Sequence, residues 1–267
     1  MSLEEAERFR EAAAAYREVL DTEPANLPAL LGVERAYASL GATDSLLPLV
    51  QRALTLRPAD ATLHTMKLRA LRMLADPVGM RAAFDAWTEV AASDAAPYRE
   101  YARLLLQSGQ TAAADSVLRR AGLTLGSTRG VELELAQLRA SMGLWEPSAR
   151  SWRIVVAESP YLEQAALFAL LPATGEAREQ IRAVLLAQPI AAGARRIIGS
   201  LELEWGSPRT GWNALRALPG DTASVRAWLD FAQRAEHAQA WLVARDALTA
   251  VFARTGAPEH VLRAATA

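Results

Sequence analysis

The chain has 267 residues, of which 51% are hydrophobic and 22% charged, a composition typical of a globular protein with a buried core. Its 29 basic and 30 acidic residues leave a net charge of −1, so bulk charge does not indicate a nucleic-acid partner. The absence of cysteine excludes disulfide bonds and thiolate chemistry. Lys67 is the only lysine, which leaves almost no candidate for Schiff-base or phosphate-loop chemistry.

No apolar run reaches the ~18 residues that a membrane-spanning helix needs. The first residues, MSLEEAERFREAAAAY, have neither the basic nor the apolar region of a signal peptide. We therefore expect a cytoplasmic protein without membrane insertion. An export signal upstream of residue 1 in a longer protein is the alternative.

Apolar residues recur at i, i+3, i+4 and i+7 throughout the chain, which predicts about sixteen short amphipathic helices and no strands. The first is expected over roughly residues 4–22. Pro48 delays the second helix of the next pair to about Leu46, and Pro172 ends a later helix early. Asp76–Pro77 and Ser207–Pro208 have the residues expected where helices begin.

The breaks between helices recur every 34 residues. Pro24 and Pro58 are 34 residues apart, and Pro160 follows Pro58 by 102, three such periods. Small residues stand twelve positions apart within several periods, at Ala102/Ala114, Ala136/Ser148, Gly199/Gly211 and Ala232/Ala244. Turn glycines recur at Gly41, Gly109, Gly143 and Gly206.

This pattern resembles the tetratricopeptide repeat family, over nearly the whole chain. The resemblance implies an all-α, right-handed solenoid of antiparallel helix pairs, with about seven repeats and a partial N-terminal one in a single domain, 1–267. In that family helix A of each repeat lines a concave groove and helix B the outer surface. The two helices of one repeat cross closely there at such a pair of small residues, so we expect close crossings here. The expected parts are a partial repeat 1–26, repeats 27–60, 61–94, 95–128, 129–162, 163–191, 192–224 and 225–257, and a C-terminal cap 258–267.

Residues for catalysis are scarce. His64, His237 and His260 are never spaced i, i+4, and no nucleophile-elbow, dinucleotide or phosphate-loop motif is present. His64 is expected at the edge of the core, and the pair Glu132 and Glu134 on a solvated helix face. We therefore predict no enzymatic activity, no catalytic residue, no cofactor and no metal.

The seven tryptophans are expected mostly in the core. Six fall at apolar or aromatic positions of the repeat: Trp87, Trp145, Trp152, Trp212, Trp228 and Trp241. Trp205 alone falls at a position that is usually polar. It is a candidate for an exposed binding anchor, although packing is the favoured interpretation.

A second stripe on each helix A would face the groove of such a repeat. Arginine gathers there without an acidic residue at the matching positions. The predicted binding residues are Arg35, Arg69, Arg72, Arg99, Arg103, Gln107 and Gln137. Arginine suits bidentate recognition of carboxylates, whereas a solvated helix face is the alternative interpretation.

We therefore expect a non-catalytic adaptor that binds an extended acidic peptide or protein segment and no nucleic acid. The alternative is a structural subunit that assembles with another copy or a neighbouring protein. That alternative depends on the first helix, which lacks a helix A before it, and on the apolar terminus HVLRAATA. The first helix also suits the repeat region of a longer protein.

Overall fold

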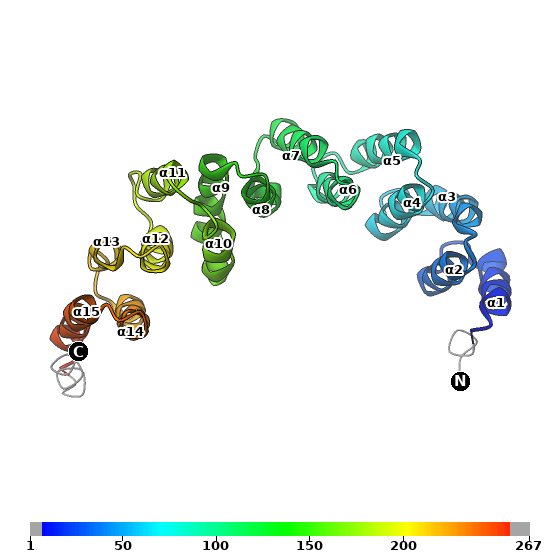
Figure 1. Cartoon of the computed structure of the whole chain (residues 1–267). Helices are drawn as coiled ribbons and strands as arrows, with labels where there is room; N and C mark the ends of the chain where they lie inside the picture. The colour runs from blue at the N-terminus through cyan, green and yellow to red at the C-terminus, as the bar shows by residue number, and fades with distance from the viewer. Residues whose placement is uncertain (1–6, 257–267) are drawn as a thin grey trace. The chain divides into compact units, whose positions relative to one another are not determined.

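The computed structural model describes residues 7–256, apart from the side chain of Arg129. Within that range the chain forms fifteen α-helices and three short 3-10 helices and no β-strand, so the predicted all-α class is confirmed (Figure 1). The helices divide into two compact units, one ending at Val131 and the other beginning at Glu132. A single domain over 1–267 stays a prediction.

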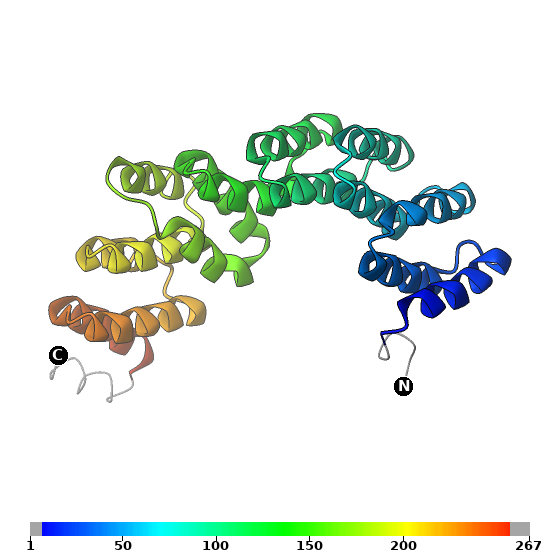
Figure 2. The ribbon, with the colours of Figure 1, turned by 45° about the vertical axis from the view of Figure 1, so that its right-hand side comes forward.

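Unit 1 contains seven α-helices, joined by short loops and packed in antiparallel pairs (Figures 1 and 2). They are α1 (Phe9–Thr22), α2 (Leu27–Leu40), α3 (Leu46–Leu56), α4 (Ala61–Met73), α5 (Pro77–Val90), α6 (Ala96–Gln107) and α7 (Thr111–Leu125). Helices α2, α4 and α6 are the A helices of the predicted repeats, and α3, α5 and α7 are the B helices. The late start of α3 at Leu46 is as predicted.

Unit 2 continues the alternation with eight α-helices. They are α8 (Glu132–Ser141), α9 (Trp145–Glu158), α10 (Glu163–Leu170), α11 (Glu176–Leu185), α12 (Ala192–Glu204), α13 (Pro208–Leu215), α14 (Thr222–His237) and α15 (Trp241–Thr255). The even-numbered helices are A helices and the odd-numbered ones are B helices. Helix α14 begins three residues before the expected repeat at 225, because the side chain of Asp221 accepts a hydrogen bond from Ser224 N and caps the helix there.

Capping residues set the limits of many of these helices. Asp76 accepts a hydrogen bond from Gly79 N at 2.8 Å and so begins α5, as its sequence predicts. Ser207 makes no such bond, and α13 begins at Pro208 without a side-chain cap. The four predicted turn glycines all adopt left-handed backbone angles, with φ between +68° and +82°.

The close helix crossings lie at the small residue pairs. Ser148 Oγ on α9 donates a 2.7 Å hydrogen bond to the carbonyl oxygen of Ala136 on α8, so the two backbones are nearly in contact. A Cβ atom added to Gly211 on α13 would lie 2.6 Å from the carbonyl oxygen of Gly199 on α12. A side chain larger than the serine or glycine present would not fit at these two sites. The predicted crossings are confirmed there.

One pair is irregular. Helix α10 has eight residues and ends at Leu170, two residues before Pro172, as predicted. It packs mainly against α12 and α9 rather than against its expected partner α11, which packs against α9 and α12. The repeat over 163–191 therefore lacks the tight hairpin of its neighbours, and one side of α10 is left uncovered.

The tryptophans follow the prediction except at the last helix. Trp87, Trp152, Trp212 and Trp228 are buried, and Trp145 is half-buried. The prediction of a core position is wrong for Trp241, whose side chain is 46% exposed at the start of α15. Within residues 7–256 no further helix follows α15, so nothing there covers that ring. The expected cap 258–267 and the terminus HVLRAATA lie outside the described residues.

Candidate functional site

The predicted binding residues all lie on A helices, but in both units. Arg35 is on α2, Arg69 and Arg72 on α4, Arg99, Arg103 and Gln107 on α6, and Gln137 on α8. Gln137 therefore belongs to unit 2 and is treated apart from the others. We call the A-helix surface of α2, α4 and α6 the unit-1 face.

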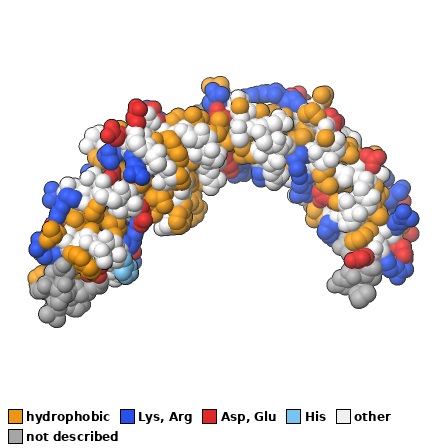
Figure 3. Space-filling model, viewed as in Figure 1, with side chains coloured by type: hydrophobic (Ala, Val, Ile, Leu, Met, Phe, Trp, Pro, Cys, Tyr) orange, Lys and Arg blue, Asp and Glu red, His pale blue; other side chains and the backbone are white. Residues whose placement is uncertain are grey.

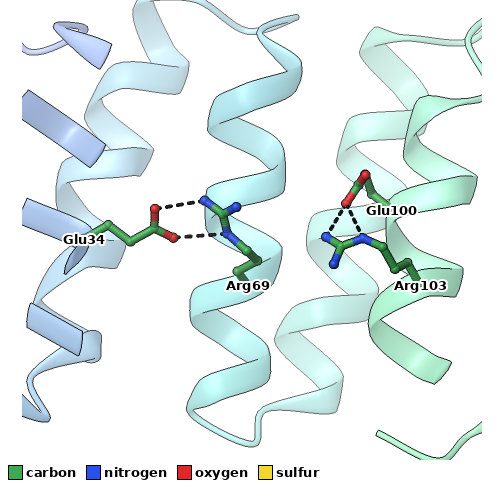
Figure 4. A network of polar contacts seen from close by, with 4 residues as sticks. All are labelled: Glu34, Arg69, Glu100 and Arg103. Atoms are coloured by element: carbon green, nitrogen blue, oxygen red, sulfur yellow. Dashed lines mark hydrogen bonds and ion pairs between the residues drawn. The ribbon is translucent and has the colours of Figure 1, made fainter. Parts of the chain in front are cut away.

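Two of its arginines are paired within the face, so the prediction that the stripe lacks counter-charges is wrong. Arg69 donates to both carboxylate oxygens of Glu34 on α2, from Nη2 at 2.8 Å and from Nε at 3.1 Å (Figure 4). Arg103 donates from Nη2 and Nε, at 2.5 and 3.1 Å, to one oxygen of Glu100 on its own helix. Glu34 was missed because its side chain reaches from a position that faces the core in the family to the neighbouring helix.

Arg72 and Arg99 differ from this pair. Their side chains make no hydrogen bond or ion pair with any described residue, and the Nε atom of Arg72 is buried without a partner. Arg35 is exposed. Arg72 and Arg99 therefore contribute positive charge that no described side chain neutralises. A ligand carboxylate can approach the unpaired guanidinium groups without displacing a carboxylate of the chain.

A shallow pocket of about 290 Å³ connects the three helices of this face. Leu31 on α2, Thr65 and Arg69 on α4, and Glu100 on α6 all line it. The pocket therefore combines an apolar side chain, a hydroxyl group and one member of each of two ion pairs, Arg69 and Glu100. It suits one side chain of an extended ligand better than a small molecule, because small-molecule sites are usually enclosed clefts of roughly 300–1,000 Å³.

Unit 2 contains a second groove, which the sequence did not reveal. Its floor is one side of α12, and α10 and α14 form its walls. Two adjoining pockets of about 330 and 320 Å³ lie along it and share Gln164, Leu167, Asp230 and Arg234. We call this surface the unit-2 groove. The sequence signal that precedes it is Pro172, which shortens α10.

Other features of unit 2 are structural. Trp205 donates a 3.1 Å hydrogen bond to the carbonyl oxygen of Leu171, and the Arg178 guanidinium lies 5.1 Å from its ring centre. These contacts agree with packing rather than with an exposed anchor. The prediction that Glu132 lies on a solvated face is wrong, because its side chain is buried at the start of α8.

The environment of His64 is that of a structural residue and not of a catalytic one. His64 is buried, stacks on Trp87 with ring centres 5.1 Å apart, and places Nε2 2.8 Å from the carbonyl oxygen of Pro58. Burial lowers the pKa of His64 below its ordinary value.

Across residues 7–256, no group of three His, Asp or Glu side chains could hold a metal ion. No helix in that range is long and apolar enough to cross a membrane. His260 lies outside the described residues.

The helix order identifies the type of fold. The A helices of unit 1 begin at Leu27, Ala61 and Ala96, so successive pairs start 34 and 35 residues apart. Close crossings at small residues join A and B helices in both units, as at Ala102 and Ala114, which are both buried. The fold is tetratricopeptide-like.

No protein-family model and no curated protein matches the chain. Among solved structures it is similar to a human IFIT1 dimer with PPP-AAAA, at 13% identity and a TM-score of 0.36, covering 97% of this chain and 68% of that one. It is also similar to the P58(IPK) TPR domain, at 14% identity and a TM-score of 0.29, covering 98% and 93%. The chain is also similar to the APC/C hetero-tetramer Cut9-Hcn1, at 14% identity and a TM-score of 0.29, covering 96% of this chain and 52% of that one.

Proposed function

We propose that this tetratricopeptide-like chain is a non-catalytic adaptor that binds an extended, acidic segment of a partner protein on the unit-1 face. The observation that carries the proposal is that Arg72 and Arg99, whose side chains have no partner among the described residues, lie on A helices that also line the pocket between α2, α4 and α6. An extended segment crossing these helices would contact each of them in turn, as helical repeats allow.

The ion pairs refine the roles within that face. Arg69 and Arg103 already hold Glu34 and Glu100, so they contribute less to ligand affinity than the unpaired Arg72 and Arg99. Replacing an internal carboxylate by a ligand carboxylate exchanges one ion pair for another and yields little net free energy. Ligand carboxylates therefore bind first to Arg72 and Arg99, and affinity falls as salt is added.

The test is selection from a random 12-residue peptide library on the wild-type chain, followed by affinity measurements on the selected peptides. We expect enrichment of Asp and Glu, and binding about 5-fold or more weaker in the double variant Arg72→Gln/Arg99→Gln. The matched control is Arg17→Gln/Arg52→Gln, which removes two exposed arginines from α1 and α3. Selected peptides without acidic enrichment, or equal affinity for both double variants, would overturn the proposal.

Assembly with another copy is a second candidate, favoured by the uncovered apolar side chains of α15. Trp241, Leu242 and Phe252 are all at least 37% exposed on that helix. Light scattering over a concentration series distinguishes the two functions. A dimer that Trp241→Ala/Leu242→Ser converts to a monomer would support assembly, and a monomer at all concentrations would refute it. We place the adaptor in the cytoplasm.

A further inference from the structure

The unit-2 groove has the form of a docking site for a short segment. Arg196, Ser200 and Glu204 follow each other at i, i+4 and i+8 along its floor on α12. Eight helical residues span ~12 Å, the length of three to four extended residues or about two helical turns. The groove is therefore long enough for a few consecutive side chains of a ligand.

Its apolar wall exists because α10 is short and packs away from α11. Leu167 of α10 and Leu171, directly after that helix, line the groove, and the ring of Phe168 beside them is 64% exposed. In the space-filling view, hydrophobic side chains gather over α10 (Figure 3). Ile197 on the floor and Phe231 on the α14 wall also line the first pocket. A bulky apolar side chain of a ligand would lose most of its water contact there.

One end of the groove carries an unpaired cation. Arg226 lines the first pocket only, is exposed, and its side chain makes no hydrogen bond or ion pair with any described residue. The neighbouring Arg196 is different, since it donates to both oxygens of Glu163 at 2.5 and 2.8 Å. That contact raises the pKa of Arg196 and leaves its charge compensated. Arg226 therefore determines the charge at this end.

The other end has the opposite sign. Glu204 lines the second pocket only, where Arg234 donates to it at 2.9 Å. Asp230 lies 3.7 Å from the same guanidinium. Two carboxylates share one arginine, so this end has one excess negative charge. The groove thus presents a positive end, an apolar middle and a negative end.

We propose that the unit-2 groove binds a short segment of a partner protein that carries one bulky apolar side chain between an acidic and a basic residue. The apolar side chain packs on Phe168 and Leu167, the acidic residue binds Arg226, and the basic residue lies beside Glu204 and Asp230. This site does not depend on the unit-1 face and binds a different sequence pattern, so one chain can hold two segments.

The probes are synthetic 12-residue peptides of Gly and Ser that contain one Glu, one Leu and one Arg. The set covers spacings of one to four residues, with Glu before and after Leu. Fluorescence anisotropy with the wild-type chain measures their affinity. We expect members with all three residues to bind, and to bind about 10-fold more tightly than peptides with Ser in place of Leu. No binding by any member at about 1 mM would overturn the proposal.

Substitutions at exposed positions connect this binding to the groove without disturbing the fold. Phe168→Ala should weaken binding about 10-fold, whereas Phe252→Ala on α15 should leave it unchanged. Arg226→Glu should weaken it about 5-fold and should favour peptides in which Lys replaces Glu. Arg216→Glu, an exposed arginine outside the groove, is the control. Equal losses in a variant and its control would contradict the assignment.

The two proposals can fail separately. Arg72→Gln/Arg99→Gln should bind these three-residue-pattern peptides as the wild-type chain does, because both arginines belong to unit 1. A loss of binding in that variant would overturn the unit-2 assignment and leave the unit-1 proposal intact. If the wild-type chain dimerises and Phe168→Ala abolishes the dimer, the occupant is a second copy and the proposal is refuted.

Discussion

The crossing of α12 and α13 provides a sharp test of how this chain is packed. Replacing Gly211 by alanine adds a Cβ atom 2.6 Å from the carbonyl oxygen of Gly199 and 3.3 Å from the side chains of Glu202 and Phe231. Ordinary contacts at such a Cβ begin at 3.4 Å, so the two backbones must separate by about 0.8 Å. Backbone atoms within a helix cannot rotate away as the end of a side chain can.

The expected magnitude combines two opposing effects. Alanine stabilises a helix interior relative to glycine by ~0.5–1 kcal/mol. Overpacking of a well-packed core costs ~1–3 kcal/mol, and here a backbone atom is the obstacle. We therefore expect Gly211→Ala to lower the free energy of unfolding by about 1–2 kcal/mol.

Gly193→Ala, on the partner helix α12 of the same crossing pair, is the matched control. Its added Cβ would lie 3.1 Å from Glu163 Oε1, the end of a flexible side chain, and otherwise at ordinary distances. We expect a change of less than ~0.5 kcal/mol. Urea unfolding followed by tryptophan fluorescence measures both, since Trp212 and Trp228 pack in the same cluster as Leu215. A Gly211→Ala variant as stable as Gly193→Ala would refute the close crossing.

Three further predictions follow from individual contacts. Glu34→Gln/Glu100→Gln should free the guanidinium groups of both paired arginines and so tighten the binding of the selected acidic peptides several-fold, as measured by fluorescence anisotropy. Unchanged affinity would mean that these two ion pairs are not part of the binding surface. Because burial lowers the pKa of His64, the unfolded chain takes up its proton first, so stability should fall as pH drops below ~6.5, and His64→Gln should weaken that dependence in urea titrations. Glu202 is fully buried and accepts a 2.6 Å hydrogen bond from Arg182. Because Arg182→Met removes that partner, it should lower the free energy of unfolding in urea by about 1–3 kcal/mol. Arg182→Met/Glu202→Gln should recover part of that loss.

The repeat was visible in the sequence because close backbone approach restricts the residues that fit. Ala136 and Ser148, or Gly199 and Gly211, can stand at a crossing where a larger side chain cannot. Turn glycines with positive φ are restricted in the same way. These constraints act on single residues at fixed spacing, so the 34-residue period and the alternation of helices with turns could be predicted.

The binding surfaces were less visible, because they depend on how side chains and helices meet. A long carboxylate side chain can reach a neighbouring helix, so the position of Glu34 in its repeat did not reveal the pair with Arg69. Pro172 predicts a short helix, but the 34-residue spacing does not predict that α10 packs against α12 and α9 instead of α11, with Phe168 exposed. Trp241 shows the same limit, since its predicted burial requires a following helix that the described residues do not contain.

The most direct test of the adaptor function is hydrogen–deuterium exchange of the full chain with and without the acidic peptide selected from the random library. Peptide binding on the unit-1 face predicts slower amide exchange in α2, α4 and α6, with the B helices α3, α5 and α7 unchanged. The protection should disappear in Arg72→Gln/Arg99→Gln at the same peptide concentration. Protection confined to the B helices, or the same protection in that variant, would contradict the account.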